Sequence, residues 1–208
     1  MKNILNRVKT EIKAIWKIES NRRMIKDVLL LSCAAIIFHI LYWNTNMNSW
    51  IFGPYTQEIY DFFRHLAFNG SLLLCGNFID KPFDVQDTVY HFYYLMPNGL
   101  KVYDLTMNIN VDCSGVKQLL QWLLIMILCR GKWWKKGIYF VIGCIVILFF
   151  NIIRIYLLTS LFADHPEMFQ WVHDWIARPM MYVIIFSMWL LWISYFASKK
   201  PNTTKEKA

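Results

Sequence analysis

Long hydrophobic runs alternate with short polar segments along this chain of 208 residues. Four of the runs approach or reach the roughly 20 apolar residues that a helix needs to cross a bilayer. They are 28–43, 116–129, 137–161 and 179–197. The pattern predicts an all-α integral membrane protein, a multi-span helical bundle of about four spans, with interfacial helices and a short extracytoplasmic loop or hairpin.

The distribution of charge orients the predicted spans. Eight basic residues lie in 1–26, four in 130–136 and four in 199–207, whereas 44–112 holds three basic residues against seven acidic ones. Because basic loops stay in the cytoplasm, we predict a multi-pass membrane protein with both termini cytoplasmic and with 44–112 and 162–177 outside. The formal net charge of +8 then indicates contact with anionic lipid and no nucleic acid.

A fifth apolar segment, 58–79, carries Glu58, Asp61, Arg64 and His65 in its first half. If this segment crossed the membrane, every later loop would change sides and the basic 130–136 turn would lie outside. We therefore predict a helix that lies on the outer surface or dips into it. An additional hairpin that the pattern does not reveal is the alternative.

The remaining segments complete the predicted organisation. Residues 1–26 place apolar side chains at helical spacing among lysines, which predicts a cytoplasmic amphipathic segment. A membrane domain follows at 27–198, and 199–208 forms a cytoplasmic tail. Within the membrane domain, the outer loop 80–112 contains a Pro-Asn-Gly turn and an alternating polar–apolar stretch. This loop is expected to form a β-hairpin or an extended segment.

Cys113 stands where the polar outer loop gives way to the apolar run 116–129. We predict that it lies at an outward-facing helix N-terminus capped by Asp112 or Ser114. The unpaired N–H groups and the dipole of such a terminus favour an anion, which predicts a stabilised thiolate. Gly115 has no Cβ, so a substrate backbone is expected to approach there.

Two other polar residues are predicted at the same membrane depth. Helical rise places Arg154 about 25 Å above the cytoplasmic start of 137–161, near the outer boundary of a core about 30 Å thick. An arginine in an apolar run is costly and needs a partner or a function. Asn151 lies one turn earlier on the same face. His173 lies in the outer segment just before the last span.

The chemistry of Cys113, Arg154 and His173 suits acyl transfer. A thiolate attacks a carbonyl carbon, and an imidazole exchanges protons with the nucleophile and the leaving group. A guanidinium stabilises the oxyanion that forms. If the three side chains meet at the outer surface, they predict a cysteine nucleophile with a proton carrier and an oxyanion stabiliser.

With these residues identified, the sequence resembles the exosortase/archaeosortase family. The family signature is Cys-(Ser/Ala)-Gly at a helix start, Asn-x-x-Arg in the next span and a His before a later span. This chain has DCSG at 112–115, NIIRI at 151–155 and HDW at 173–175. LLLCGNFI at 72–79 is similar to the apolar stretch that precedes the family's outer loop. The resemblance covers residues 60–197.

The resemblance implies a membrane cysteine protease or transpeptidase of a prokaryotic inner (cytoplasmic) membrane, with Cys113, Arg154 and His173 as its catalytic residues. Such an enzyme cleaves C-terminal sorting signals (a short motif, a transmembrane helix and a basic tail) of exported proteins on the outer face through a thioester acyl-enzyme. Its partners would be those exported substrates, membrane lipid and a lipid or glycan acceptor. No cofactor and no metal are expected. The chain is shorter than the eight-span members and is similar to the compact proteins of the family.

Other interpretations remain open. A non-catalytic membrane assembly or export factor of the same fold is the alternative function, whereas the apolar span interiors disfavour a transporter. His165 is the alternative to His173. Structural or surface roles are expected for the remaining candidates: Cys33, Cys75, Cys129, Cys144, His39, His65, His91, Lys117, Asp112 and Arg178.

Overall fold

The computed structural model describes residues 19–45 and 47–197. The chain divides after residue 50 into two compact units, which are described separately. Residues 1–18 of the predicted amphipathic segment and the whole predicted tail 199–208 lie outside the described residues.

The first unit is built on a single long helix, α2 (Glu19–Asn44). It contains the predicted span 28–43, whose apolar centre forms a shorter apolar stretch, Ser32–Tyr42. Several of its apolar side chains are exposed, Ile36 and Ile40 among them. A second short helix, α3 (Met47–Phe52), continues across the boundary to the second unit.

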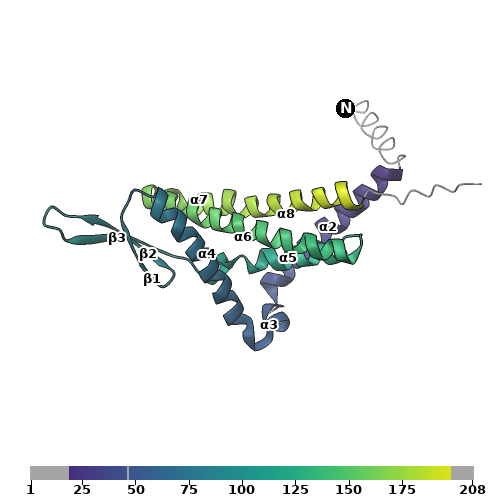
Figure 1. Ribbon diagram of the computed structural model, residues 1–208, viewed down its shortest axis with the longest axis horizontal. Coiled ribbons are helices and arrows are strands. Elements are labelled where there is room, and N and C mark those ends of the chain that lie inside the picture. The colour runs from purple at the N-terminus through teal and green to yellow at the C-terminus, as the bar shows by residue number, and fades with distance from the viewer. Residues whose placement is uncertain (1–18, 46, 198–208) are drawn as a thin grey trace, which may run out of the picture. The chain divides into compact units, whose positions relative to one another are not determined.

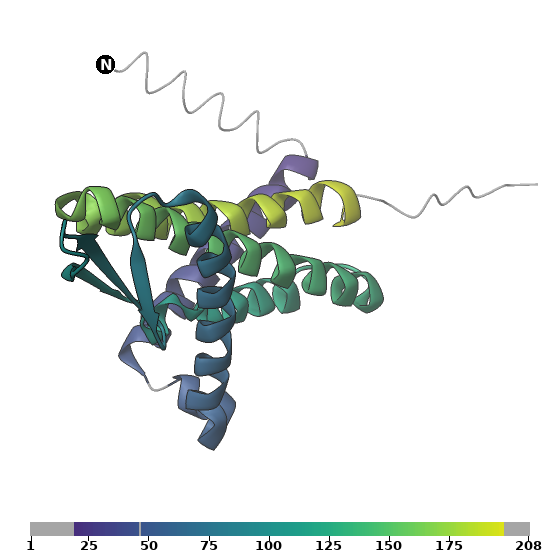
Figure 2. The ribbon, with the colours of Figure 1, turned by 60° about the vertical axis from the view of Figure 1, so that its left-hand side comes forward.

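Three helices of the second unit lie side by side: α5 (Val116–Leu128), α6 (Trp133–Asp164) and α8 (Arg178–Trp192) (Figures 1 and 2). Gly143 of α6 allows close contact with α5, because a Cβ at this position would collide with the Trp122 ring. The indole N–H of Trp122 donates to the carbonyl of Phe140 at 3.2 Å. This contact fixes how α5 lies along α6.

The turn between α5 and α6 is held by side chains. Lys136 is 6% exposed and donates to the carbonyls of Ile127 (3.1 Å) and Cys129 (2.9 Å), which end α5. A cation at a helix C-terminus is favoured by the unpaired carbonyls and by the dipole. The indole of Trp192 donates to the Arg130 carbonyl at 3.1 Å and thereby ties α8 to the same turn.

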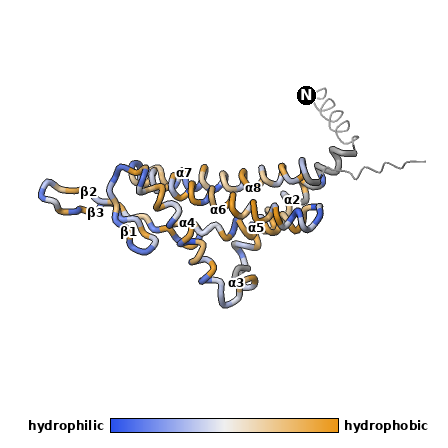
Figure 3. The backbone as a smooth tube through the Cα atoms, in the orientation of Figure 1, coloured by the Kyte–Doolittle hydropathy of each residue, from blue (hydrophilic) through white to orange (hydrophobic). Residues whose placement is uncertain are grey.

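The long helices of this unit are apolar over their exposed surfaces. Trp133–Asp164 and the continuous helical segment Pro166–Tyr195 are long and apolar enough to cross a membrane, and only 33% of the best window of each is buried. The first contains the predicted span 137–161 and the second contains all but the last two residues of the predicted span 179–197; Figure 3 shows the hydropathy along both. Val116–Leu128 is a shorter apolar helix.

A fourth helix, α4 (Thr56–Phe78), packs against α6 and contains the charged apolar segment 58–79. Its helical character is confirmed, whereas its position relative to a membrane stays a prediction. Its buried face consists of Tyr60, Ala67, Phe68, Ser71 and Cys75. At Gly70 a Cβ would lie 2.6 Å from the side chain of Ile152. The absence of a side chain there lets α4 pack closely against α6 at Ile152, which lies within the Asn-x-x-Arg segment.

The outer loop 80–112 forms a three-stranded antiparallel sheet in the order β1 (Phe83–Gln86), β2 (Val89–Leu95) and β3 (Lys101–Asn108). The predicted β-hairpin is therefore present as β2 and β3, and the sheet contains one strand, β1, that was not predicted. The fold is mostly helical with one small sheet, not all-α.

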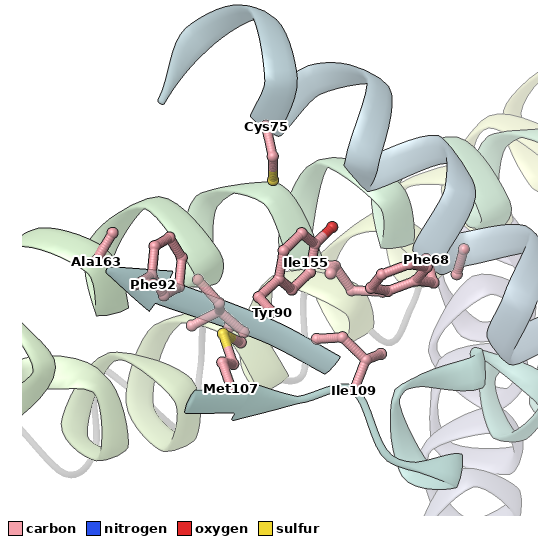
Figure 4. Close-up of a cluster of buried hydrophobic side chains, with 11 residues drawn as sticks. Phe68, Cys75, Tyr90, Phe92, Met107, Ile109, Ile155 and Ala163 are labelled. Atoms are coloured by element: carbon pink, nitrogen blue, oxygen red, sulfur yellow. The ribbon is translucent and has the colours of Figure 1, made fainter. Parts of the chain in front are cut away.

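One face of the sheet completes the core of the second unit. Tyr90 and Phe92 of β2 are fully buried and Met107 of β3 is nearly so, and they pack against α4 and α6 (Figure 4). The Tyr90 hydroxyl also lies 3.0 Å from the Ser71 hydroxyl of α4. Burying a large apolar side chain contributes roughly 1.5–3 kcal/mol, so this core anchors the strand that leads into Cys113.

The connection from α6 to α8 is helical after His165, which is not helical. It consists of η3 (Pro166–Met168), α7 (Phe169–Val172) and a π-helical turn, η4 (His173–Ala177), whose closing bond runs from the Arg178 N–H to the His173 carbonyl. Pro179 explains the wide turn, because its ring would clash with the carbonyl four residues earlier in a regular α-helix. The π turn therefore begins at His173.

Candidate functional site

Cys113 lies in a short 3₁₀ turn, η2 (Val111–Ser114), between β3 and α5. The helix begins after Gly115, which has φ +82° and serves as the N-cap without any side-chain cap. The prediction that Asp112 or Ser114 caps α5 is therefore wrong, although the Ser114 hydroxyl accepts a hydrogen bond from the Val116 N–H at 3.3 Å. The turn directs the chain from the sheet into the bundle within four residues.

Asn151 of α6 holds this turn in place. Its Nδ2 donates to the Cys113 carbonyl at 2.9 Å, and the residue is fully buried. A Cβ on Gly115 would lie 3.1 Å from the same Nδ2 atom. Gly115 is thus required by a positive φ and by a close neighbour within the chain, which differs from the predicted reason, the approach of a substrate.

Arg154, one helical turn after Asn151, faces the Cys113 thiol through a hydrogen bond and its charge. It is 4% exposed. Its Nε has no hydrogen-bond partner, and no carboxylate forms an ion pair with it, among the described residues. A buried cation costs several kcal/mol unless it is compensated. Cys113 and Arg154, which are 41 positions apart by their numbering, are therefore brought together as predicted from depth.

The protonation of Cys113 differs from the prediction. Burial raises the pKa of the Cys113 thiol above its ordinary value, and the charge and hydrogen bond of Arg154 lower it only in part. The nearby Asp112 carboxylate also raises this pKa. Desolvation thus outweighs the stabilisation expected at a helix N-terminus, and the thiol form dominates at neutral pH.

His173 is oriented by its own neighbours. Its Nδ1 N–H donates to Asp174 Oδ1 at 3.0 Å, and its ring stacks on Phe169 with a centroid separation of 5.7 Å. Asp174 also accepts from Gln170 at 2.6 Å and pairs with Arg178 at 3.1 Å. A carboxylate on one ring nitrogen fixes the tautomer and leaves Nε2 for proton exchange.

No hydrogen bond joins His173 to Cys113 in the described part of the chain. Instead, a set of charged and polar residues connects the two. Arg178 interacts electrostatically with Lys117 of α5 and with Tyr182 of α8, and Tyr182 interacts in turn with Arg154. The structure thus brings Cys113 and Arg154 into contact and places His173 at the same end of the bundle, linked through Asp174 and Arg178.

Sequence reasoning missed Asp174 and Tyr182. Asp174 adjoins His173 and precedes Arg178 by four positions, which is the spacing of a helical ion pair. Tyr182 follows Arg178 by four positions and lies on the same helical face. Both signals were present in the sequence, and only an explicit helical reading across residues 173–182 would have found them.

The other candidates lie elsewhere. His165 contacts Glu167 at 3.4 Å on the surface, His65 contacts Asp87 at 3.7 Å, and His91 approaches Thr106 at 3.3 Å. No group of three or more His, Cys, Asp or Glu side chains gathers as a metal site within residues 19–45 and 47–197.

The fold and the site define a helical membrane protein that places a thiol beside a buried guanidinium, which has no carboxylate partner among the described residues. A family model described as transmembrane exosortase (Exosortase_EpsH) matches residues 82–194, a range that contains Cys113, Arg154 and His173. The chain belongs to this transmembrane exosortase family, whose members are membrane proteases that process C-terminal sorting signals. No curated protein matches the chain, and no solved structure does.

Proposed function

We propose that this protein is a cysteine protease or transpeptidase that cleaves the C-terminal sorting signals of exported proteins at the outer face of the membrane. One observation carries the proposal. Arg154 is buried with a thiol as its partner and has no carboxylate partner among the described residues. A buried guanidinium without a carboxylate partner can stabilise an oxyanion that forms only during the reaction.

In the proposed reaction, His173 accepts the thiol proton as Cys113 Sγ attacks the substrate carbonyl carbon. The negative charge on the carbonyl oxygen is stabilised by Arg154. The C–N bond then breaks, His173 returns the proton to the leaving amine, and a thioester remains on Cys113. An acceptor hydroxyl, amine or water then gives a proton to His173 and attacks the thioester; the C–S bond breaks, and the departing Cys113 thiolate takes that proton back to restore the thiol. Asp174 keeps the His173 ring in the tautomer that this exchange requires.

The proposed topology has four spans, with both termini in the cytoplasm and the membrane catalytic domain at 27–198. The positive-inside distribution of charge supports it. The cytoplasmic turn at 130–136 and the candidate site lie at opposite ends of α5, which supports a site on the outer side. A membrane-impermeant thiol reagent added to intact cells should therefore reach Cys113, and modification only after lysis would contradict this orientation.

The test of function uses an exported protein encoded near this gene that ends in a short motif, an apolar helix and basic residues. A tagged copy should be shortened in the native host and stay full-length with Cys113→Ala or Cys113→Ser. The membrane level of each variant is the control for folding. Unchanged processing in both variants would reject the proposal.

A second function is a non-catalytic assembly or export factor of the same fold. The raised pKa of Cys113 and the separate partners of His173 favour it. Mass spectrometry decides between the two functions, because a cysteine transpeptidase incubated with the tagged substrate accumulates a thioester on Cys113. Hydroxylamine should release that adduct, whereas a factor carries no adduct while export of its client still depends on the protein.

A further inference from the structure

The sheet has an open edge next to the candidate site. β3 pairs with β2 on one side, and the described residues contain no strand on its other side. The Ile109 N–H donates to the Thr88 carbonyl at 3.0 Å, so Ile109 faces β2. Because hydrogen-bonding direction alternates along an antiparallel strand, Asn108 and Thr106 turn their N–H and C=O groups outward.

The part of this edge nearest Cys113 is regular and accessible. The side chains of Thr106 and Asn108 are exposed. Leu105 pairs with Phe92 and Tyr103 with Tyr93, which leaves Asp104 as a bulge that interrupts the strand. A bulge ends regular pairing, so the usable edge runs from Leu105 to Asn108, which precedes Cys113 by five positions.

The direction of β3 matches the direction of a sorting-signal substrate. β3 runs from the projecting tip of the β2–β3 hairpin toward the start of α5 (Figures 1 and 2). In the proposed topology this is the direction from outside toward the membrane. A substrate whose exported domain precedes its transmembrane helix enters the site in the same direction.

We propose that the edge Leu105–Asn108 binds the extended substrate segment on the N-terminal side of the scissile bond as an added strand parallel to β3. The inference rests on the proposed function and adds how the substrate is held. Strand addition uses main-chain hydrogen bonds, while side-chain contacts on alternate residues supply specificity. The short usable edge accommodates about four residues at roughly 3.3 Å each, which suits a short motif.

Cysteine cross-linking tests the register. The enzyme carries Cys113→Ala, which prevents turnover, together with Thr106→Cys or Asn108→Cys. The reporter is an exported domain fused to the sorting signal that wild-type enzyme processes, with single cysteines placed in turn along its extended segment. Oxidation in membranes should link Thr106→Cys to one reporter position and Asn108→Cys to the position two residues further toward the C-terminus.

The matched control is Gln86→Cys on β1, an exposed position on the opposite edge of the same sheet. It should link to no reporter position above the background without an added cysteine. Reversed order of the two linked positions, uniform linkage, no linkage or equal linkage from β1 would each overturn the inference.

A pair of variants at Thr106 tests the main-chain contact. Thr106→Pro removes an N–H that points away from β2, a change that edge strands tolerate. Thr106→Val keeps the N–H and also loses the Thr106–His91 contact. We expect Thr106→Pro to raise KM about tenfold relative to Thr106→Val with kcat unchanged, the loss of a single hydrogen bond. Equal KM values in the two variants would overturn the inference.

These results separate the inference from the proposed function. If wild-type enzyme does not cleave the reporter in a Cys113-dependent manner, the proposed function fails. If cleavage requires Cys113 but either the cross-links or the Thr106 pair does not behave as stated, only strand addition fails. If Thr106→Pro does not fold, the cross-linking register alone decides.

Discussion

Cations at the sheet have different partners from Arg154, a buried cation of the helical bundle. On the sheet, Lys101 donates to both oxygens of Asp84 at 2.7 and 2.8 Å, and Lys81 lies 2.7 Å from Asp104. In the bundle, Arg154 is nearly fully buried and meets a thiol. Lys101 and Lys81 are thus paired with carboxylates, whereas no carboxylate among the described residues pairs with the buried Arg154.

This difference distinguishes the ion pairs that order the sheet from Arg154, for which we propose a catalytic role. An exposed ion pair is screened by solvent and contributes little to stability, yet its geometry links β1 to β3 and orders the sheet. A buried carboxylate beside Arg154 would lower the cost of burial but would also occupy the guanidinium. Stability alone therefore does not explain Arg154, whereas the proposed role of its guanidinium at an oxyanion does.

The largest effect is expected from removing Arg154, the buried cation without a carboxylate partner among the described residues. Arg154→Ala should lower kcat for reporter cleavage by about 10²–10³-fold, the usual cost of losing one oxyanion donor. Lys101→Ala, which removes a paired cation, should leave kcat within about twofold of wild type, because a screened surface pair contributes little. The measurement is cleavage in membranes at matched protein levels. Equal losses in the two variants would erase the distinction between the two regions.

The next effect comes from the residue that holds the cysteine turn. Asn151→Ala removes the hydrogen bond to the Cys113 carbonyl and should lower kcat roughly tenfold with KM unchanged. Asn151→Asp removes the same donor and adds a carboxylate one helical turn from Arg154, as on the sheet. It should be less active than Asn151→Ala, because the new carboxylate would compete for Arg154. A more active Asn151→Asp would contradict the proposed role of Arg154 in binding an oxyanion.

The proximity of Cys113 and Arg154 was easier to predict from the sequence than the residues that surround them. Membrane depth alone brought Cys113 and Arg154 together, because helical rise is fixed and α5 and α6 are neighbours in the chain. Their contact also needs Gly143 and Gly70, whose missing side chains admit α5 and α4. The π turn at His173 follows from Pro179, a signal that a regular helix count overlooks.

The partners of side chains were harder to predict than their positions. The pKa of Cys113 depends on burial by α4 and the sheet, which come from parts of the chain far from residue 113. The third strand, β1, lacked a strong sequence signal because it has only four residues. Local sequence patterns therefore predict the helices. The pKa of the Cys113 thiol and the number of strands depend on long-range packing, which those patterns do not show.

The pH dependence of thiol reactivity sharpens the comparison. The thiolate is the reacting form, and burial raises the pKa of Cys113 above its ordinary value of 9.0 while Arg154 opposes the rise. The alkylation rate of Cys113 should therefore increase with pH to a midpoint above 9.0. In Arg154→Ala the midpoint should move higher still, whereas Lys101→Ala should leave it unchanged. A lower midpoint in Arg154→Ala would show that the guanidinium does not act on the thiol.

The smallest effect is expected from the paired charges of the sheet. Hydrogen bonds from Lys101 and Tyr103 lower the pKa of Asp84 below its ordinary value of 3.8 in the folded protein. A lowered folded pKa gives stability that is present above the unfolded pKa and is lost as pH falls through the folded pKa. Thermal unfolding in detergent should therefore show Asp84→Asn slightly less stable than wild type at neutral pH, with the two converging as the pH falls below 3.8. Because the pair is exposed, salt should also reduce the stability difference between wild type and Asp84→Asn. If that difference persists in high salt and in acid, Asp84 stabilises the sheet through something other than its charge.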